Sequence, residues 1–419
     1  MEKTLYPLSR QQMEILTYDL TYPKTNINTV SGFIRLEKPY ANDIITQIIR
    51  ILVSHEQSLR LRITEKDGQY FQYEMDYYES GIQIINKKVE SIEDLEEIHQ
   101  QDAGYAFQWK DNPLCFFTIT RLGDTVYVGV TAHHSIADGY SMVQIGKLVN
   151  DYSELLVNNQ LPQLVEHRYT DHVERQQKAI KSLRYKKDCA YWRDMFTNWD
   201  GICCIKPGAK QTNSATSEQI TKQLDNDFTK SLISLCREMS ISPAVPFMGA
   251  IALYLYSINP DKKRVDIGIL KHNRSIASDK KTIGMFAKDA LLTLNIHTYI
   301  QNEACAFLKE VQKEVLKTYY HGLCSLSEIT TIAKNLNPDI DKVRDVEFIY
   351  LPFLHNADCE IGYTHNGKSE TSADFMLWQV GKEENMTFMM DYRIDVFCVK
   401  EAEKVYDDIM EIVEEMVVD

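Results

Sequence analysis

The sequence predicts a mixed α/β (α+β) protein built of two lobes. Segments with the two-residue alternation of strands and segments with the spacing of amphipathic helices follow one another in both halves of the chain. The chain has 419 residues, more than one hydrophobic core usually fills, and 44% of them are hydrophobic. Because the sequence becomes polar after about residue 157, we expect an N-terminal lobe at 1–175 and a C-terminal lobe at 176–419.

Each half supplies its candidate elements in order. In the first half, residues 28–37 predict a strand and residues 41–60 a helix, because isoleucines recur there at helical spacing. The second half predicts a helix from about 228, an apolar helix at 244–257, strands at 264–270 and 385–394, and an amphipathic C-terminal helix.

The net charge restricts the classes of partner that we expect, and the cysteine content indicates the cellular compartment. The 46 basic and 60 acidic side chains give a net charge of −14, which argues against nucleic acid or an anionic membrane as the partner. Nine cysteines, an odd number without zinc-type spacing, favour reduced thiols, no metal site and a cytoplasmic location. The N-terminal residues contain no apolar stretch, so no secretory signal is expected.

One corner of the first half combines several residues with chemical potential. Residues 114–135 predict a hairpin that turns at residues 122–124, and its second strand ends in His133 and His134. The stripe of apolar residues that follows predicts a helix beginning near Asp138. The histidines therefore lie where a strand passes through a loop into a helix.

Residues of these types suit proton transfer. A histidine at a strand end can accept a proton from an attacking amine, hydroxyl or thiol, and we assign that role to His134. Adjacent residues on an extended segment point to opposite faces, so His133 is expected to be structural. Asp138 either orients a histidine or pairs with an arginine, and Gly139 permits a tight turn. Alternatively, these residues are only polar loop residues that cap the helix.

The string HHSIADG resembles the HHxxxDG signature of the CoA-dependent acyltransferase superfamily, and more closely that of the condensation domains of nonribosomal peptide synthetases. Other family-like stretches occur in the same order along the chain. They lie at residues 6–16 (with Ser9 and Gln11), 54–63 (with Leu59 and Arg60), 169–176 (with Tyr169 and Asp171), 266–275 and 283–294 (with Gly284 and Phe286).

This resemblance implies two chloramphenicol-acetyltransferase-like lobes in a V-shaped pseudo-dimer with a tunnel between them. It implies that His134 assists attack of an acceptor on a thioester, that Asp138 pairs with Arg60, and that His133 supports the loop. Ser141, Gly284, Phe286 and Lys288 are expected at the substrate site. No covalently bound cofactor is expected; the phosphopantetheine thioester of a carrier protein, or a CoA thioester, would bring the acyl group.

The resemblance also predicts the partners, and it identifies a place where this sequence departs from the family pattern. Donor and acceptor acyl or peptidyl carrier proteins are the expected partners, the chain is expected to be a monomer, and no adenylation or carrier-site motif is visible. Lys288 and Asp289 stand where the family usually has Asn-Thr. They form either a surface turn, or a site at which Lys288 meets an anionic group of the substrate.

Three functions remain open at this point. The first is acyl transfer from a thioester to an amine, which forms an amide in nonribosomal peptide or lipopeptide biosynthesis. The second is an ester-forming or free-acceptor acyltransferase of the same superfamily, which shares the corner. The third is a non-catalytic carrier-docking module, against which the presence of both histidines counts.

Overall fold

The computed structural model describes residues 3–163, 165–209, 214–296, 304–352, 360–368, 373–380 and 386–418. The chain forms two compact units. Unit 1 contains Met1–Lys178, His272–Ala287 and Leu354–Asn366, and unit 2 contains Ala179–Lys271, Lys288–Phe353 and Gly367–Asp419. The first junction lies close to the predicted boundary at 175, but two later segments also belong to unit 1.

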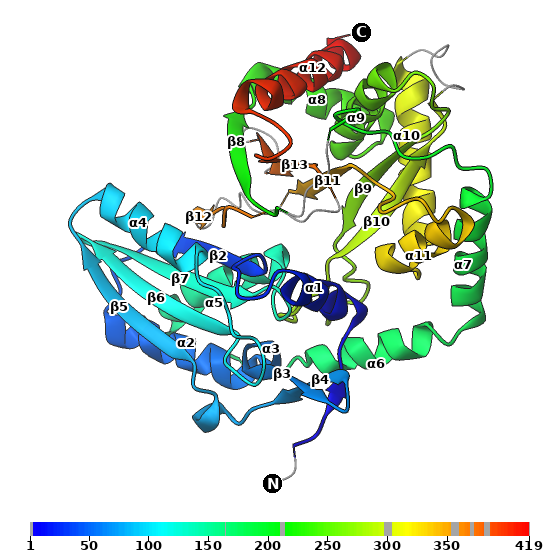
Figure 1. The fold of residues 1–419 in the computed structure, drawn as a ribbon. Helices are drawn as coiled ribbons and strands as arrows, with labels where there is room; N and C mark the ends of the chain where they lie inside the picture. The colour runs from blue at the N-terminus through cyan, green and yellow to red at the C-terminus, as the bar shows by residue number, and fades with distance from the viewer. Residues whose placement is uncertain are drawn as a thin grey trace. The chain divides into compact units, whose positions relative to one another are not determined.

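Unit 1 is built on a five-stranded sheet of order β12-β2-β7-β6-β5 (Figure 1). The strands are β2 (Thr29–Arg35), β5 (Gln83–Val89), β6 (Cys115–Leu122), β7 (Thr125–His133) and β12 (Glu360–Tyr363). Neighbouring strands are antiparallel except for the parallel pair β5 and β6. The edge strand β12 comes from the last of the three segments of this unit.

Helices cover both faces of this sheet (Figure 1). Helix α4 (Ile92–Ala103) packs on one face, where Phe33 stacks on His99 with ring centroids 3.8 Å apart. Helices α2 (Asn42–His55) and α5 (Gly139–Val157) pack together on the other. The buried isoleucines Ile45, Ile48 and Ile49 explain why α2 folds onto the sheet.

The remaining elements of unit 1 are a small sheet and several helices. A three-stranded sheet has the order β1-β4-β3, with β1 (Tyr6–Pro7), β3 (Leu61–Lys66) and β4 (Gln69–Glu74). The helices are α1 (Arg10–Thr21), α3 (Gln57–Arg60), the 3₁₀ helix η1 (Tyr77–Glu79) and α6 (Tyr169–Ala179), whose last residue falls in unit 2.

Unit 2 is built on a six-stranded sheet of order β10-β9-β11-β13-β14-β8. The strands are β8 (Ser217–Gln223), β9 (Val265–Lys271), β10 (Lys288–Leu294), β11 (Val346–Leu351), β13 (Phe375–Val380) and β14 (Thr387–Arg393). Strand β11 is parallel to both β9 and β13, and the other neighbours are antiparallel.

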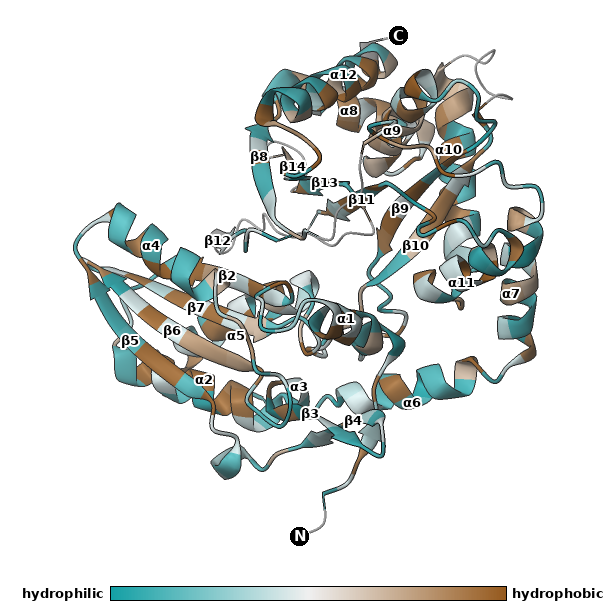
Figure 2. Cartoon of the chain, in the orientation of Figure 1, coloured by the Kyte–Doolittle hydropathy of each residue, from teal (hydrophilic) through white to brown (hydrophobic). Residues whose placement is uncertain are grey.

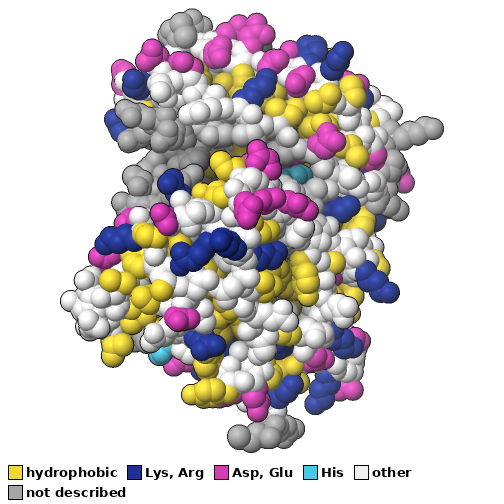
Figure 3. Space-filling model, turned by 90° about the vertical axis from the view of Figure 1, so that its left-hand side faces the viewer, with side chains coloured by type: hydrophobic (Ala, Val, Ile, Leu, Met, Phe, Trp, Pro, Cys, Tyr) yellow, Lys and Arg dark blue, Asp and Glu magenta, His cyan; other side chains and the backbone are white. Residues whose placement is uncertain are grey.

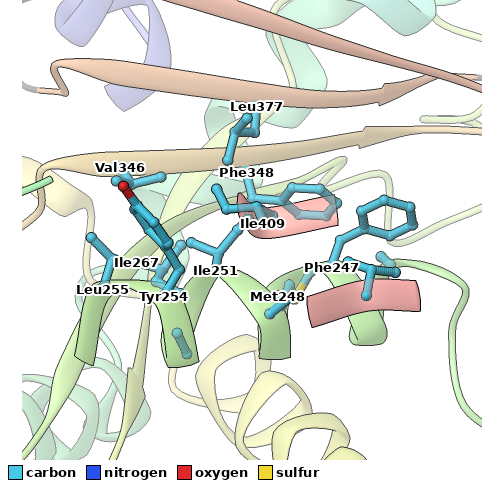
Figure 4. Packing of buried hydrophobic residues seen from close by; sticks show 14 of the residues in the cluster. Phe247, Met248, Ile251, Tyr254, Leu255, Ile267, Val346, Phe348, Leu377 and Ile409 are labelled. Carbon is cyan, nitrogen blue, oxygen red and sulfur yellow. The ribbon is translucent and has the colours of Figure 1, made fainter. Parts of the chain in front are cut away.

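The core of unit 2 lies between this sheet and the apolar helix α9 (Ala244–Ile258). Figure 4 shows Phe247, Ile251 and Leu255 of α9 beside Phe348 and Leu377 of the sheet. Figure 2 shows hydrophobic residues along α9 and β9, and hydrophilic ones over much of α4. The other helices of unit 2 are α7 (Leu183–Phe196), α8 (Asn226–Met239), α10 (Ala304–Tyr320), α11 (Leu326–Leu336) and α12 (Val399–Val418).

The mixed α/β class and most of the predicted elements are confirmed. The hairpin of β6 and β7 turns at Gly123, whose φ of 58° is left-handed, and α5 begins directly after Asp138. The single helix expected at 41–60 was wrong. It breaks at Glu56, because the side chains of Gln57 and Ser58 bond to Thr170 and to the Ile283 carbonyl instead of facing solvent.

Among the described residues, no single helix is long and apolar enough to cross a membrane; only α8 and α9 taken together reach that length and composition, and they are bent by 100°. The face shown in Figure 3 carries basic and acidic side chains interspersed with hydrophobic ones.

Candidate functional site

The candidate site is the corner between β7 and α5 in unit 1. Strand β7 ends at His133, a short turn follows, and α5 starts at Gly139 with Asp138 as its N-cap. The backbone N–H of His134 donates to the Asn28 carbonyl beside the start of β2 (2.7 Å), and that of Ile136 donates to the His133 carbonyl (3.0 Å). Backbone bonds thus define the path of the loop before any side chain is considered.

Asp138 holds this loop to the later segment of unit 1. Its Oδ1 accepts hydrogen bonds from the backbone N–H of Ser141 (2.8 Å), the Ser141 hydroxyl (2.8 Å) and Nη2 of Arg274 (2.7 Å). Its Oδ2 accepts from the backbone N–H groups of Phe286 (3.1 Å) and Ala287 (3.0 Å). Both carboxylate oxygens are therefore fully engaged, and residues 138–141 are fixed to the segment 272–287.

The electrostatics agree with an ionised Asp138. Burial by itself would raise the pKa of Asp138, but the Arg274 guanidinium and the hydrogen bonds from Ser141 outweigh burial and hold the pKa below its usual range. The side chains of Asp138 and Arg274 are only 2% and 3% exposed. A buried pair of this kind costs several kcal/mol when one partner is removed.

The prediction that Asp138 pairs with Arg60 was wrong. The Arg60 guanidinium contacts the Glu74 carboxylate and donates to the backbone carbonyls of Val53 (2.7 Å) and Met75 (3.2 Å). It therefore closes the end of α2 and ties it to β4, away from the loop. The sequence did contain the right arginine, because Arg274 lies in the family-like stretch at 266–275, but nothing in the sequence linked that stretch to Asp138.

His133 is structural, as its side chain is buried and has a hydrogen-bond partner at each ring nitrogen. Nε2 lies 2.9 Å from Oδ2 of Asp19 in α1, and Nδ1 lies 2.7 Å from the Ser135 hydroxyl. These partners fit a ring that donates from Nε2 to the carboxylate and accepts at Nδ1. Asp19 and Ser135 were missed from the sequence, since Asp19 lies outside the family-like stretches and Ser135 occupies a variable position of HHSIADG.

His134 is the second histidine of the corner. The residue is partly exposed, and its Nδ1 is buried without a hydrogen-bond partner. Burial lowers the pKa of His134, although the nearby Asp138 carboxylate works against that shift. The imidazole is consequently neutral at neutral pH, the state in which it can accept a proton.

Gly284 and Phe286 form the support under Asp138. A Cβ atom at Gly284 would lie 2.2 Å from the Tyr169 ring, so only glycine allows this approach. The Tyr169 hydroxyl donates to the Met285 carbonyl (2.6 Å) and lies 2.8 Å from the Ser9 hydroxyl. Phe286 is fully buried against the rings of Tyr169 and His172. Residues from three of the family-like stretches, namely Ser9, Tyr169 and Gly284, thus lie together.

The other residues expected at a substrate site have structural partners. Ser141 is buried, and its hydroxyl contacts Asp138, Arg274 and the Gly284 backbone. The alternative of a surface turn at Lys288 was wrong, because Lys288 begins β10 and is 7% exposed. Its Nζ donates to the carbonyls of Gly322 and Cys324 in unit 2, so the ammonium is bound to backbone oxygens. Substrate contact by these residues stays a prediction.

Glu56 is a further perturbed group of unit 1. It lies at the break between α2 and α3 and is 7% exposed. Burial raises the pKa of Glu56 to about 7, against the opposing effects of a backbone hydrogen bond from Ile283 and the charge of Arg60. No group of three or more His, Cys, Asp or Glu side chains in the described part of the chain is arranged to hold a metal ion.

Comparison with known proteins places this architecture in a family. The model of the family called Condensation domain matches residues 2–419. Surfactin synthase subunit 1 of Bacillus subtilis (strain 168) is 24% identical over 99% of this chain, and a plipastatin synthase protein of the same organism is 22% identical over 99%. The chain spans only 12% and 16% of the length of these relatives.

Solved structures share the fold. The first condensation domain of the calcium-dependent antibiotic synthetase has a TM-score of 0.84 at 15% identity, covering 99% of this chain and 97% of that one. The starter condensation domain of rhizomide synthetase, solved in complex with C8-CoA, has a TM-score of 0.86 at 16% identity, covering 99% and 95%.

The fold is that of the solved condensation domains, and the HHxxxDG loop lies in unit 1. The match over nearly the whole chain makes the family assignment specific. The chain belongs to the Condensation domain family.

Proposed function

We propose that this chain joins a thioester-bound acyl or aminoacyl group to an amine acceptor and thereby forms an amide. The acceptor nitrogen attacks the thioester carbonyl, the new C–N bond forms as the C–S bond breaks, and the thiol leaves with a proton. The observation that carries this proposal is the HHxxxDG corner, in which Asp138 is locked by five hydrogen bonds while His134 keeps a neutral ring.

In this proposal the residues of the corner have separate roles. Asp138, Arg274 and Ser141 fix the loop, and His133 is anchored to Asp19. His134 then orients the acceptor amine or takes its proton as the C–N bond forms. Such groups contribute about 10² to 10⁴ in rate, so the proposal assigns a measurable share of catalysis to one side chain.

The thioester donor is proposed to arrive on the phosphopantetheine arm of a carrier protein or as an acyl-CoA. The similar starter domain of rhizomide synthetase was solved with C8-CoA, which supports testing an acyl-CoA first. Carrier proteins as donor and acceptor partners, a monomeric state and a cytoplasmic location are part of the same proposal, and they are supported by the family and by the composition.

The decisive experiment incubates the purified chain with octanoyl-CoA, or with an octanoyl-loaded carrier protein, and a panel of amino acids and aminoacyl carrier proteins. Mass spectrometry should detect an N-octanoyl product that survives mild hydroxylamine, which cleaves esters and thioesters. A hydroxylamine-labile product would instead support the ester-forming alternative. Absence of transfer from either donor to every acceptor, with the protein folded, would leave the carrier-docking alternative.

A further inference from the structure

Two cysteines of unit 2 lie in direct contact. The Sγ atoms of Cys189, in the middle of α7, and Cys324, immediately before α11, are 2.9 Å apart. Neither residue is in a disulfide bond, and both belong to the small core in which α7 and α11 pack together beside β10. A disulfide bond is about 2.05 Å long, so forming one here requires movement of less than about 1 Å.

Hydrogen bonds on both sides hold the two thiols in this position. Asp188, the neighbour of Cys189, accepts from the backbone N–H of Leu323 (3.0 Å), the neighbour of Cys324. One turn further along α7, Nε1 of Trp192 donates to the His321 carbonyl (3.0 Å). Lys288 donates to the Cys324 carbonyl from β10. The contact therefore rests on a loop that is fixed independently of the sulfur atoms.

The other described cysteines do not offer such a pair. Burial raises the pKa of the Cys115 and Cys203 thiols to about 12 and that of Cys236 to about 11, and it also raises the pKa of Cys204. Proximity distinguishes the proposed pair from these thiols, because Cys324 is also buried but has the Sγ atom of Cys189 2.9 Å away. Cys305 and Cys398 are exposed and lie in different helical regions of unit 2, so they can form mixed adducts.

We propose that Cys189 and Cys324 form a reversible disulfide that ties α7 to the loop before α11. The oxidant is a low-molecular-weight disulfide such as oxidised glutathione. The thiolate of Cys189, the less buried of the two, attacks one sulfur of the oxidant and releases the first molecule of glutathione. The thiolate of Cys324 then attacks the Cys189 sulfur and releases the second, so two protein thiols are oxidised and one glutathione disulfide is reduced.

The bond would act mainly on stability. It closes a loop of 135 residues, and cross-links across long loops restrict the unfolded chain most strongly. This modification is independent of amide formation and would stand even if the proposed reaction were wrong.

The test equilibrates the full chain with mixtures of reduced and oxidised glutathione, traps free thiols by alkylation, and maps the cysteines by mass spectrometry. A cross-linked peptide pair containing Cys189 and Cys324 is expected, together with a rise in Tm of about 5 °C or more that dithiothreitol reverses. Recovery of both residues as alkylated thiols in oxidised glutathione would overturn the proposal.

Variants separate the two steps. In Cys324→Ala, Cys189 should accumulate as a stable mixed disulfide with glutathione, and the rise in Tm should disappear. Cys236→Ala, a matched control in the same unit, should keep both the cross-link and the rise. If Cys324→Ala fails to fold, peptide mapping of the unmodified chain still decides the question. A mixed disulfide that persists on Cys189 there would also contradict the proposal.

Discussion

Each unit contains the same strand, turn and helix, yet only one copy carries the histidines. In unit 1, β7 ends at His133 and α5 begins at Gly139; in unit 2, β14 ends at Arg393 and α12 begins at Val399. The turn bonds correspond as well. Ile136 donates to the His133 carbonyl (3.0 Å), and Val396 donates to the Arg393 carbonyl (3.1 Å).

The side chains at equivalent positions of the two corners are alike at the strand end and differ at two of the positions that follow. Arg393 occupies the position of His133, is 1% exposed, and bonds to Asp374 (2.8 Å) and to Asp395 two residues later (2.7 Å). His133 likewise bonds to a distant aspartate and to the residue two positions later. The position of His134 is held by Ile394, which is 46% exposed, and that of Asp138 by Cys398.

The comparison teaches that the corner folds without either histidine. A buried, paired polar side chain is present at the strand end in both units, so this position serves architecture. The next position carries a titratable ring only in unit 1, which is why we assign the chemistry to His134. The tie through Asp138 is likewise confined to unit 1.

The largest effect is expected on stability, from Asp138→Ala. The change leaves the buried Arg274 guanidinium without its carboxylate and should lower the free energy of unfolding by about 3 to 5 kcal/mol. Cys398→Ala, at the equivalent place in unit 2, should change it by less than about 0.5 kcal/mol. Urea denaturation followed by circular dichroism measures the free energy of unfolding of both variants. Equal decreases would contradict the difference that we infer between the two corners.

The next effect concerns activity. His134→Ala should lower kcat/KM for acyl transfer by at least about a hundredfold, about 2.7 kcal/mol, because the base or positioning group is lost. Ile394→Ala, the matched change in unit 2, should leave kcat/KM unaltered. Turnover by folded His134→Ala near that of the unmodified enzyme would exclude this residue from the mechanism.

Asp19→Ala tests whether His133 affects catalysis only by positioning its neighbour His134. Loss of the carboxylate leaves Nε2 of His133 buried without a partner, which should cost about 1 to 3 kcal/mol of stability. The loop should also lose precision, so we expect kcat to fall by about tenfold, about 1.4 kcal/mol, with KM unchanged. Asp395→Ala should lower stability while kcat per folded molecule stays constant; a parallel drop in kcat would refute the distinction.

The smallest effect is a pH dependence of the unit 1 corner, since unit 2 has Ile394, which carries no titratable group, at the position of His134. Burial lowers the pKa of His134 below its ordinary 6.5, and the neutral ring is the active form. Activity should therefore fall as pH decreases, with a midpoint below 6.5. Stability should decline in the same direction, because the folded state resists protonation of this ring. A kcat/KM profile from pH 5 to 8 with a midpoint above 6.5 would contradict the assignment.

Local sequence patterns predicted the strand, loop and helix of the corner well. They did not predict which distant residues contact it. The alternating valines before His133 and the apolar stripe after Asp138 are signals within about 20 residues, and they located a strand end and a helix start. Arg274 is 136 residues from Asp138 and lies in irregular chain, where no periodicity announces a contact. The break at Glu56 was missed for a similar reason, because the partners of Gln57 and Ser58 are more than a hundred residues away.

The composition of unit 1 from separate stretches of chain restricts how this protein can be divided or recombined. A fragment that stops near residue 178 would keep both histidines but lose Arg274, the two amides that grip Asp138, and the edge strand β12. Exchanging that fragment with the corresponding one of a related domain would transfer the loop without the residues that hold Asp138. A chimaera that preserves the corner has to contain residues 272–287 together with the first part of the chain. The domain therefore has to be exchanged as a whole.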